Sequence, residues 1–314
     1  MSLWWAQGAQ VAFVLLYAPL LRGFLERYRA RLAGRHGPSI WQPFRDLRKW
    51  WNKETVRSSE STWISHWAPV YYFLAPVTVT MLIPALTSFP LPLAWMGDML
   101  AGGMILGGGG FALLLAALDS GSVYPALGAS RVRLVGTFTE SLALLLVFAA
   151  ASLAGTTIPY TVNQTLADPE WTVSATHGLV LLGWFALLIA ETGRIPIDNP
   201  STTQELSMID PARTFEASGR DLALYEWGGW MKFLVLSVVL TNVLGTPWGL
   251  ARQPTPAALA IAAVAVALKT LLAGLLLVSF EAGFAKLRLI RTVDFVVAGT
   301  LLAGLGALAA TMHL

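Results

Sequence analysis

The sequence contains no cysteine, and only 12% of its 314 residues are charged. Without thiols the chain can form no disulfide, no thiolate-bound zinc site and no cysteine-ligated iron–sulfur cluster. Histidine is also scarce, and no two of the four histidines have the helical spacing of a metal-ligand pair: His36, His66, His177 and His313. We therefore predict that this chain holds no metal and no cofactor, and that any electron transfer in its system takes place in other chains.

Apolar residues, in contrast, make up 55% of the chain, and its mean hydropathy is +0.61. A soluble protein of this length could not bury so much apolar surface in one core. We predict an all-α, polytopic membrane protein, a bundle that forms one integral membrane domain over residues 1–314. The first residues show neither the basic segment nor the cleavage site of a secretory signal, so we expect the first span to be retained.

Hydropathy predicts eight spans of about twenty residues each, at residues 4–22, 68–89, 97–118, 137–158, 175–194, 228–246, 256–280 and 294–312. Basic residues test this division because they concentrate in cytoplasmic loops. Of the 21 lysines and arginines, all except Arg252 and Lys269 lie in or beside the odd-numbered connections. We therefore predict a protein of the plasma membrane with both termini outside the cytoplasm and cytoplasmic loops at about 23–67, 119–136, 195–227 and 281–293. The net charge of +3 follows from this topology and does not indicate a nucleic-acid partner.

Two of the predicted cytoplasmic loops are long. In the first, residues 40, 44, 47 and 51 are apolar and share one helical face, which predicts an amphipathic helix at the membrane interface. That helix is either a membrane-surface anchor or, together with the loop from Arg194 to Tyr225, a platform for a soluble partner. Loops as long as the second are usually functional or disordered, and a docking surface is the interpretation that we favour.

Six carboxylates lie near the cytoplasmic ends of the predicted spans: Asp119, Glu140, Glu191, Glu226, Glu281 and Asp294. For three of them, Asp119, Glu226 and Asp294, a partly solvated position at the interface is the simpler explanation. Charges of that kind occur at the span ends of any membrane protein, and they carry no functional prediction.

The deeper charges are Glu140, Glu191, Glu281 and, near the middle of the seventh span, Lys269. Ionisable groups are costly inside a membrane and often mark proton pathways. Carboxylates held together in a dry bundle couple their protonation and can pass protons on. Arg194 lies one helical turn beyond Glu191, and we expect it to neutralise that carboxylate.

A glycine-rich run from Gly102 to Gly110 invites comparison with a nucleotide-binding loop. No Lys-Ser or Lys-Thr follows it, no strand precedes it, and it lies within an apolar run. Close packing of helices through small residues explains it better. No Ser/His/Asp triad and no phosphate loop occurs elsewhere, so the sequence predicts no catalytic residue.

The segment Glu191-Thr-Gly-Arg-Ile-Pro-Ile-Asp-Asn-Pro200, followed by Glu205-Leu206, resembles the signature of the subunit 1 family of respiratory complex I. Other motifs similar to that family follow one order along nearly the whole chain, at residues 34–38, 42–47, 128–131, 218–220 and 281–288. Quinone-reactive members carry an acidic run after the second proline, of which only Glu205 is present here. The chain looks most like the membrane-anchor subunit of energy-converting nickel–iron hydrogenases of the formate hydrogenlyase type (hydrogenase-3 and hydrogenase-4).

This resemblance implies a subunit of a larger complex. Hydrogenase large and small subunits and iron–sulfur subunits would hold the Ni–Fe and iron–sulfur centres, and an antiporter-like membrane subunit would move ions. This chain would dock the soluble arm through its loops, with the candidates Arg35, Arg45, Asp46, Arg131 and Arg220. It would link electron transfer to proton or sodium movement through Glu191, Glu140, Glu281, Asp198 and Glu205, with Arg194 as an ion-pair partner. We add Lys269 to this path because a buried lysine readily loses its proton.

Two alternatives remain open. A quinone-binding subunit of an NADH:quinone oxidoreductase would have a quinone-sized cavity that opens to the lipid beneath the first loop. A stand-alone secondary transporter would show inverted repeats with broken spans at matching positions, and the sequence shows no such repeats.

Overall fold

A computed structural model describes residues 3–166, 174–199, 208–245 and 248–311 of the chain. Within these ranges it has no strand element, only an isolated bridge between Thr87 and Ala251. The helices are α1 (Trp4–Leu32), α2 (Gln42–Trp51), α3 (Ile64–Leu82), α4 (Met99–Asp119), α5 (Val123–Ala154), α6 (Pro159–Thr165), α8 (Ala175–Glu191), α9 (Gly219–Val238), α10 (Pro256–Gly283) and α11 (Leu289–Thr311), with short helical segments η1 (Ala94–Met96), η2 (Pro211–Thr214) and the π-helical η3 (Val239–Gly245).

Each predicted span coincides with a helix. In the part of the chain that the structure describes, six helices are long and apolar enough to cross a membrane: α1, α4, α5, α9 with η3, α10 and α11. At the two other predicted positions, α8 is apolar but has only 17 residues, and α3 has 19 residues, two of them prolines. The predicted all-α, multi-pass membrane fold is confirmed.

The helix ends differ from the predicted span ends. α1 continues to Leu32 instead of ending at residue 22, and α5 begins at Val123 instead of residue 137. Most of the predicted cytoplasmic segment 119–136 is therefore helical, since only residues 120–122 connect α4 to α5. Hydropathy marks the point at which a helix leaves the hydrocarbon, whereas backbone hydrogen bonds let the helix continue into water.

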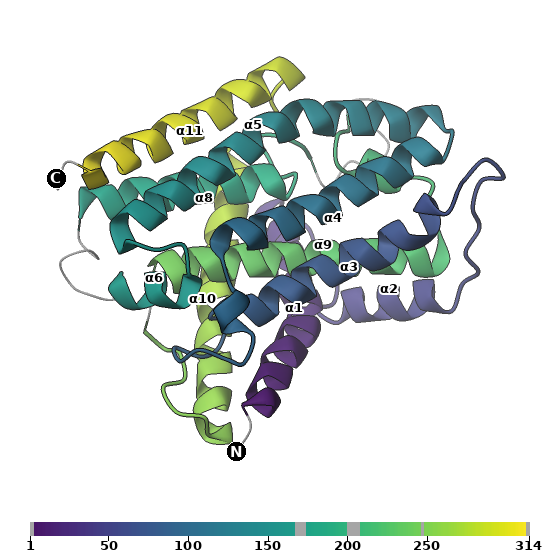
Figure 1. Cartoon of the computed structure of the whole chain (residues 1–314). Coiled ribbons are helices and arrows are strands. Elements are labelled where there is room, and N and C mark those ends of the chain that lie inside the picture. Colours follow the sequence, from purple (N-terminus) through teal and green to yellow (C-terminus); the bar gives the residue numbers. More distant parts are fainter. Residues whose placement is uncertain (1–2, 167–173, 200–207, 246–247, 312–314) are drawn as a thin grey trace.

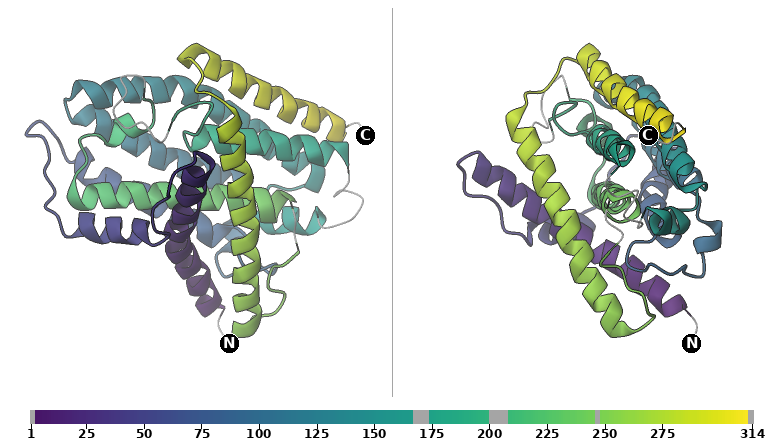
Figure 2. Two further views of the ribbon diagram at one scale, coloured as in Figure 1. Left: turned by 180° about the vertical axis from the view of Figure 1, so that it is seen from behind. Right: turned by 90° about the vertical axis from the view of Figure 1, so that its left-hand side faces the viewer.

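α9 is the central helix of the bundle. In its apolar 18-residue stretch 72% is buried, against 28–39% in the corresponding stretches of the other five long helices. α3, α4, α5, α8, α9 and α11 run side by side, while α1 and α10 cross them at a steep angle (Figures 1 and 2). Contacts between elements agree with this arrangement, because α9 packs against α1, α3, α8 and α10.

The chain after α3 is extended and buried, where a continued helix was predicted up to residue 89. Gln10 on α1 donates from Nε2 to the carbonyls of Thr80 (2.6 Å) and Ile83 (3.0 Å), and its Oε1 accepts the N–H of Leu86 at 3.0 Å. Asn242 on η3 donates to the carbonyl of Ala85 at 3.0 Å. Irregular backbone at membrane depth is tolerated only where protein satisfies its polar groups, and these two amides do so.

Exposed tryptophans mark two interfaces. One group lies around the first loop and the start of α3: Trp41, Trp51, Trp63 and Trp67. The other lies at the opposite helix ends: Trp4, Trp5, Trp95 and Trp248. Tryptophan is enriched where the bilayer meets water, so the two groups delimit the membrane-embedded part of the bundle.

Candidate functional site

A charged pair lies at the centre of the bundle, at the end of α8. Glu191 is the last residue of α8, and its Oε2 accepts a hydrogen bond from Nζ of Lys232 on α9 at 2.6 Å. The side chains are 25% and 14% exposed, so water screens this ion pair only in part. Lys232 follows Met231 and precedes Phe233, both buried apolar residues of the central helix.

The turn that ends α8 decides which acid Arg194 meets. Gly193 has φ +56°, and the N–H of Arg194 bonds to the carbonyl of Ile189 at 3.1 Å, which is the Schellman pattern of a helix end. Arg194 consequently leaves the face that carries Glu191. Its guanidinium lies 3.2 Å from Oε1 of Glu281 instead.

Glu281 on α10 is the centre of a buried three-residue cluster. It is 4% exposed and accepts from Arg194 and, at 2.5 and 3.1 Å, from Arg29 on α1. The Arg194 guanidinium also lies over the ring of Phe233, 4.5 Å from its centroid. Because the cluster joins α1, α10 and the loop after α8, it fixes the elements around the Glu191–Lys232 pair.

Asp198 is fully buried in the loop after α8, and its acceptor positions are filled. Lys286 donates to it at 2.8 Å, and the backbone N–H groups of Asn199, Ile209 and Asp210 donate at 2.9, 2.8 and 2.8 Å. These bonds tie the loop after α8 to the segment after α10. The structure thus gives Asp198 the contacts of a tether.

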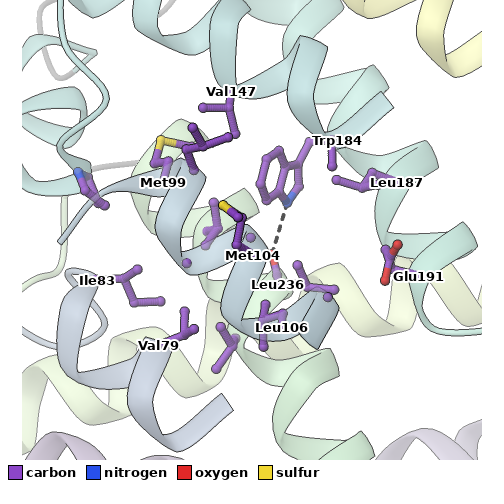
Figure 3. A pocket seen from close by; sticks show the side chains of 18 of the residues that line it. Val79, Ile83, Met99, Met104, Leu106, Val147, Trp184, Leu187, Glu191 and Leu236 are labelled. Carbon is purple, nitrogen blue, oxygen red and sulfur yellow. Dashed lines mark hydrogen bonds between the residues drawn. The ribbon is translucent and has the colours of Figure 1, made fainter. Parts of the chain in front are cut away.

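Three cavities meet at the Glu191–Lys232 pair. A polar cavity of about 220 Å³ is also lined by Arg22, Tyr72 and Glu226. An apolar cavity of about 300 Å³ extends away from it between α3, α4, α5, α8 and α9 (Figure 3). A third cavity of about 110 Å³ reaches toward α5. Glu191 and Lys232 line all three cavities, so the pair forms their common boundary.

Arg213 adds a permanent charge to two of these cavities, the polar one and the third one. It forms an ion pair with Asp210. Burial is the largest influence and disfavours the charge on Arg213, but Asp210, Tyr72 and Glu191 together outweigh it and raise the pKa of Arg213 above its usual value. The guanidinium therefore stays charged at every physiological pH.

Glu140 lies on the outer surface of α5 and not inside the bundle. Its Oε1 is 3.2 Å from Arg133, and the two side chains are 58% and 57% exposed. Glu140 nevertheless lines both the apolar cavity and the third cavity, together with Glu191. It thus stands where the central cavities reach the lateral surface of the chain.

Lys269 is placed apart from these groups, near the opposite helix ends. Its Nζ donates to Oδ1 of Asn242 at 3.2 Å and to the carbonyl of Trp248, and it lies 5.2 Å from the Trp248 ring centroid. It lines none of the three cavities. Glu205, the remaining predicted member of the path, lies outside the described residues.

The predicted docking residues are of two kinds. Arg35, Arg45 and Arg220 are exposed. Asp46 accepts a hydrogen bond from Gln42 at 2.9 Å, within its own helix. Arg131 donates to the carbonyl of Met208 at 3.1 Å, which connects α5 to the long loop.

The predicted amphipathic helix is confirmed as α2, and it packs on the protein. Leu47 is buried, and Trp50 packs against Trp230 of α9 with 6.5 Å between ring centroids. After α2 the first loop is clasped to the start of α9 by an ion pair between Arg57 and Asp221 at 2.8 Å. The first loop therefore lies directly against the start of α9.

Sequence reasoning missed two residues of the site. Lys232 is one of them, although a lone lysine in the apolar run from Trp227 to Val239 is a signal that could have drawn attention to it. Glu226, which we assigned to the interface, lines the polar cavity instead. Within the described ranges no group of three or more His, Cys, Asp and Glu side chains could hold a metal ion.

Comparison with known proteins adds the family. Residues 7–312 match the family described as NADH dehydrogenase. Formate hydrogenlyase subunit 4 of Escherichia coli (strain K12) is 31% identical over 283 residues, which cover 89% of this chain and 90% of that protein. Hydrogenase-4 component C of the same organism is 31% identical over 264 residues, covering 84% and 82%.

Among solved structures, a chain of the membrane-bound sulfane sulfur reductase, an archaeal respiratory membrane complex, has the same fold. The TM-score is 0.81 at 21% identity, and the match covers 97% of this chain and 99% of that one. The match over residues 7–312 and the two relatives above 30% identity agree with the resemblance seen in the motifs. The chain belongs to the NADH dehydrogenase subunit 1 family, in which formate hydrogenlyase subunit 4 and hydrogenase-4 component C are its relatives.

Proposed function

We propose that this chain is the membrane-anchor and coupling subunit of a group 4 nickel–iron hydrogenase or formate hydrogenlyase-type complex. The names of its two relatives support the type of complex. The quinone-binding alternative is not favoured, because both of these relatives are hydrogenase or formate hydrogenlyase components. The Ni–Fe and iron–sulfur centres belong to partner subunits in this proposal, and this chain supplies none of them.

The observation that carries the coupling role is the Glu191–Lys232 pair at the meeting point of three cavities. A proton that enters the polar cavity can neutralise Glu191 and leave Lys232 without its counter-charge. That state is unfavourable in a partly dry site, so Lys232 then gives up a proton more easily. The pair thereby accepts a proton on one side and releases one on the other.

A proton released by the pair would move laterally, through the third cavity, to Glu140. This cavity contains both Glu191 and Glu140 and opens at the surface of α5. An exposed ion pair on a membrane-spanning helix is costly against lipid, which favours cover by another membrane subunit. We assign that position to the antiporter-like subunit, which would receive the proton or respond to its charge.

Two other predicted members of the proton path have structural roles in this proposal. Glu281, with Arg194 and Arg29, holds the helices around the pair, and Asp198 tethers the loop that follows α8. Both contact arrangements support the site by holding its elements in place. Lys269 and Glu205 stay predictions of the sequence, the first because it lies apart and the second because it is outside the described residues.

Docking of the soluble arm is assigned to the surface formed by α2, the clasped first loop and the start of α9. Arg35, Arg45 and Arg220 project from it and would meet acidic side chains of the partner. The test is isolation of the complex in mild detergent through a tag on this chain, with identification of its companions by mass spectrometry. Recovery of a nickel-binding large subunit and an antiporter-like subunit is expected. Recovery of NADH-oxidising flavoprotein subunits would contradict the proposal.

A further inference from the structure

The apolar cavity has a lining that fits hydrocarbon and little else. Its walls are mainly aliphatic and aromatic side chains, and in Figure 3 they surround the space from Ile83 and Met99 at one end to Glu191 at the other. Trp184 lies along it with its Nε1 bonded to the carbonyl of Leu236 at 3.2 Å, so its ring presents only apolar surface. The volume of about 300 Å³ reaches the range of small-molecule sites.

Polar groups are confined to the edges of the cavity. Asp98 at the end away from Glu191 is occupied in capping α4, where it accepts from the N–H of Leu100 at 2.6 Å and from Thr157 at 2.8 Å. At the other end Glu191 bonds to Lys232, and at the side Glu140 contacts Arg133. No cluster of free donors and acceptors is left along the walls to hold water, and apolar cavities of this kind stay dry.

The entrance lies between α4 and α5. Met104 (71% exposed) and Leu144 (46% exposed) line both the cavity and the outer surface. Gly103 and Gly107 border the same opening, and a methyl group added at either would meet nothing within 4 Å. Because α4 and α5 are both membrane-spanning helices, this opening faces the hydrocarbon of the bilayer. It lies at Met104 and Leu144, deeper along the two helices than Glu140 and the third cavity, where we place the antiporter-like subunit.

We propose that the cavity holds one acyl chain of a membrane lipid, which enters between α4 and α5 and lies beside Trp184. An empty cavity forfeits dispersion contacts along its walls, water finds no partners there, and an acyl chain is the molecule present at the entrance. The bound chain keeps water out of the space between Glu191 and the far end at Asp98. This sealing role rests on the proposed function of Glu191, whereas binding of the chain does not.

Photolabelling of the intact complex tests the site. The complex is reconstituted into phosphatidylcholine vesicles that contain a phosphatidylcholine with a diazirine in one acyl chain, illuminated and mapped by mass spectrometry. Label on Met99 and Trp184 is expected. These residues are only 8% and 6% exposed, so lipid on the outer surface cannot reach them, and their labelling reports an acyl chain inside the cavity. Gly103→Phe should lower their labelling by about tenfold by obstructing the entrance. Labelling of the exposed Leu268 on α10 should not change.

A matched control is Gly8→Phe on α1, where an added side chain also meets nothing within 4 Å, and it should label like the unmodified chain. Label restricted to Met104 and other exposed residues would overturn the proposal. The result is independent of ion movement. If Met99 and Trp184 of the unmodified complex are not labelled while Glu191→Gln abolishes coupling, only the acyl-chain proposal is refuted. If both residues are labelled while Glu191→Gln leaves coupling unchanged, only the proposed function is refuted.

Discussion

At the scale of single residues, the pairing of charges was the least predictable property of the site. Glu191 and Arg194 are three residues apart, which is one helical turn, but the helix ends before Gly193 and their side chains separate. Glu191 pairs with Lys232 instead, 41 residues away. Sequence spacing identifies partners within a helix, whereas a pair between two helices depends on how they pack. The need for a partner could be predicted, because a lone carboxylate at that depth is costly.

A double substitution distinguishes the contribution of the Glu191–Lys232 pair to assembly from its contribution to ion movement. Lys232→Met alone leaves Glu191 without its counter-charge, which should cost about 3–5 kcal/mol and lower the yield of assembled complex. Lys232→Met combined with Glu191→Gln removes both charges and should restore much of the yield without restoring ion movement. Yield is measured by size-exclusion chromatography. Equal loss in the single and double variants would show that the two residues do not interact.

A second residue-scale prediction concerns the Glu281 cluster. Arg194→Ala should destabilise the assembled complex, since Glu281 is 4% exposed and keeps only Arg29. Arg194→Lys retains a charge but loses the planar guanidinium over Phe233, so an intermediate thermal stability is expected. Normal thermal stability of Arg194→Ala would mean that water reaches Glu281.

At the scale of elements, the existence of the helices was predictable and their ends were not. Apolar runs of sufficient length forced the eight predicted positions, each of which is a helix. The extended segment after α3 escaped prediction because it is as apolar as a helix, and only Gln10 and Asn242 from distant elements satisfy its backbone. Polar amides in apolar runs are the signal that could have exposed it.

This dependence predicts a large effect of Gln10→Leu. The substitution removes three hydrogen bonds to buried backbone groups, and each orphaned group costs about 1–3 kcal/mol. A clear drop in the melting temperature of the purified complex is expected. Gln164→Leu is the control, because Gln164 is exposed and its side chain makes one hydrogen bond, of 3.4 Å, within the described residues. Equal melting temperatures for the two variants would contradict the assigned role of Gln10.

At the scale of the whole molecule, the distribution of basic residues supports one orientation in the membrane, and the two tryptophan groups mark its two interfaces. The first loop, the long loop after α8 and the segment after α10 lie on the side rich in Lys and Arg, which we place in the cytoplasm. The surface proposed for the soluble arm then faces the cytoplasm, and the polar cavity lies on the same side, because Asp210 and Arg213 of the long loop line it. Electron transfer and proton entry can therefore be joined on one side of the chain.

Since the chain contains no cysteine, single introduced cysteines report its orientation directly. Ser61→Cys in the first loop should react with a membrane-impermeant maleimide only in inverted vesicles. Gln253→Cys, in the connection before α10, should react only in intact cells. The reverse pattern would place the docking surface on the wrong side for a cytoplasmic partner.

The central claim is that Glu191 passes the charge that couples electron transfer to ion movement. The most direct measurement is proton and sodium uptake by vesicles that contain the assembled complex, per electron pair transferred, in the unmodified chain, in Glu191→Gln and in Asp294→Asn. Asp294 is an exposed acid at the start of α11 and serves as the matched control. We predict that Glu191→Gln lowers the ion-to-electron ratio by about tenfold or more, while Asp294→Asn leaves it unchanged. An unchanged ratio in Glu191→Gln, at full assembly, would contradict the account.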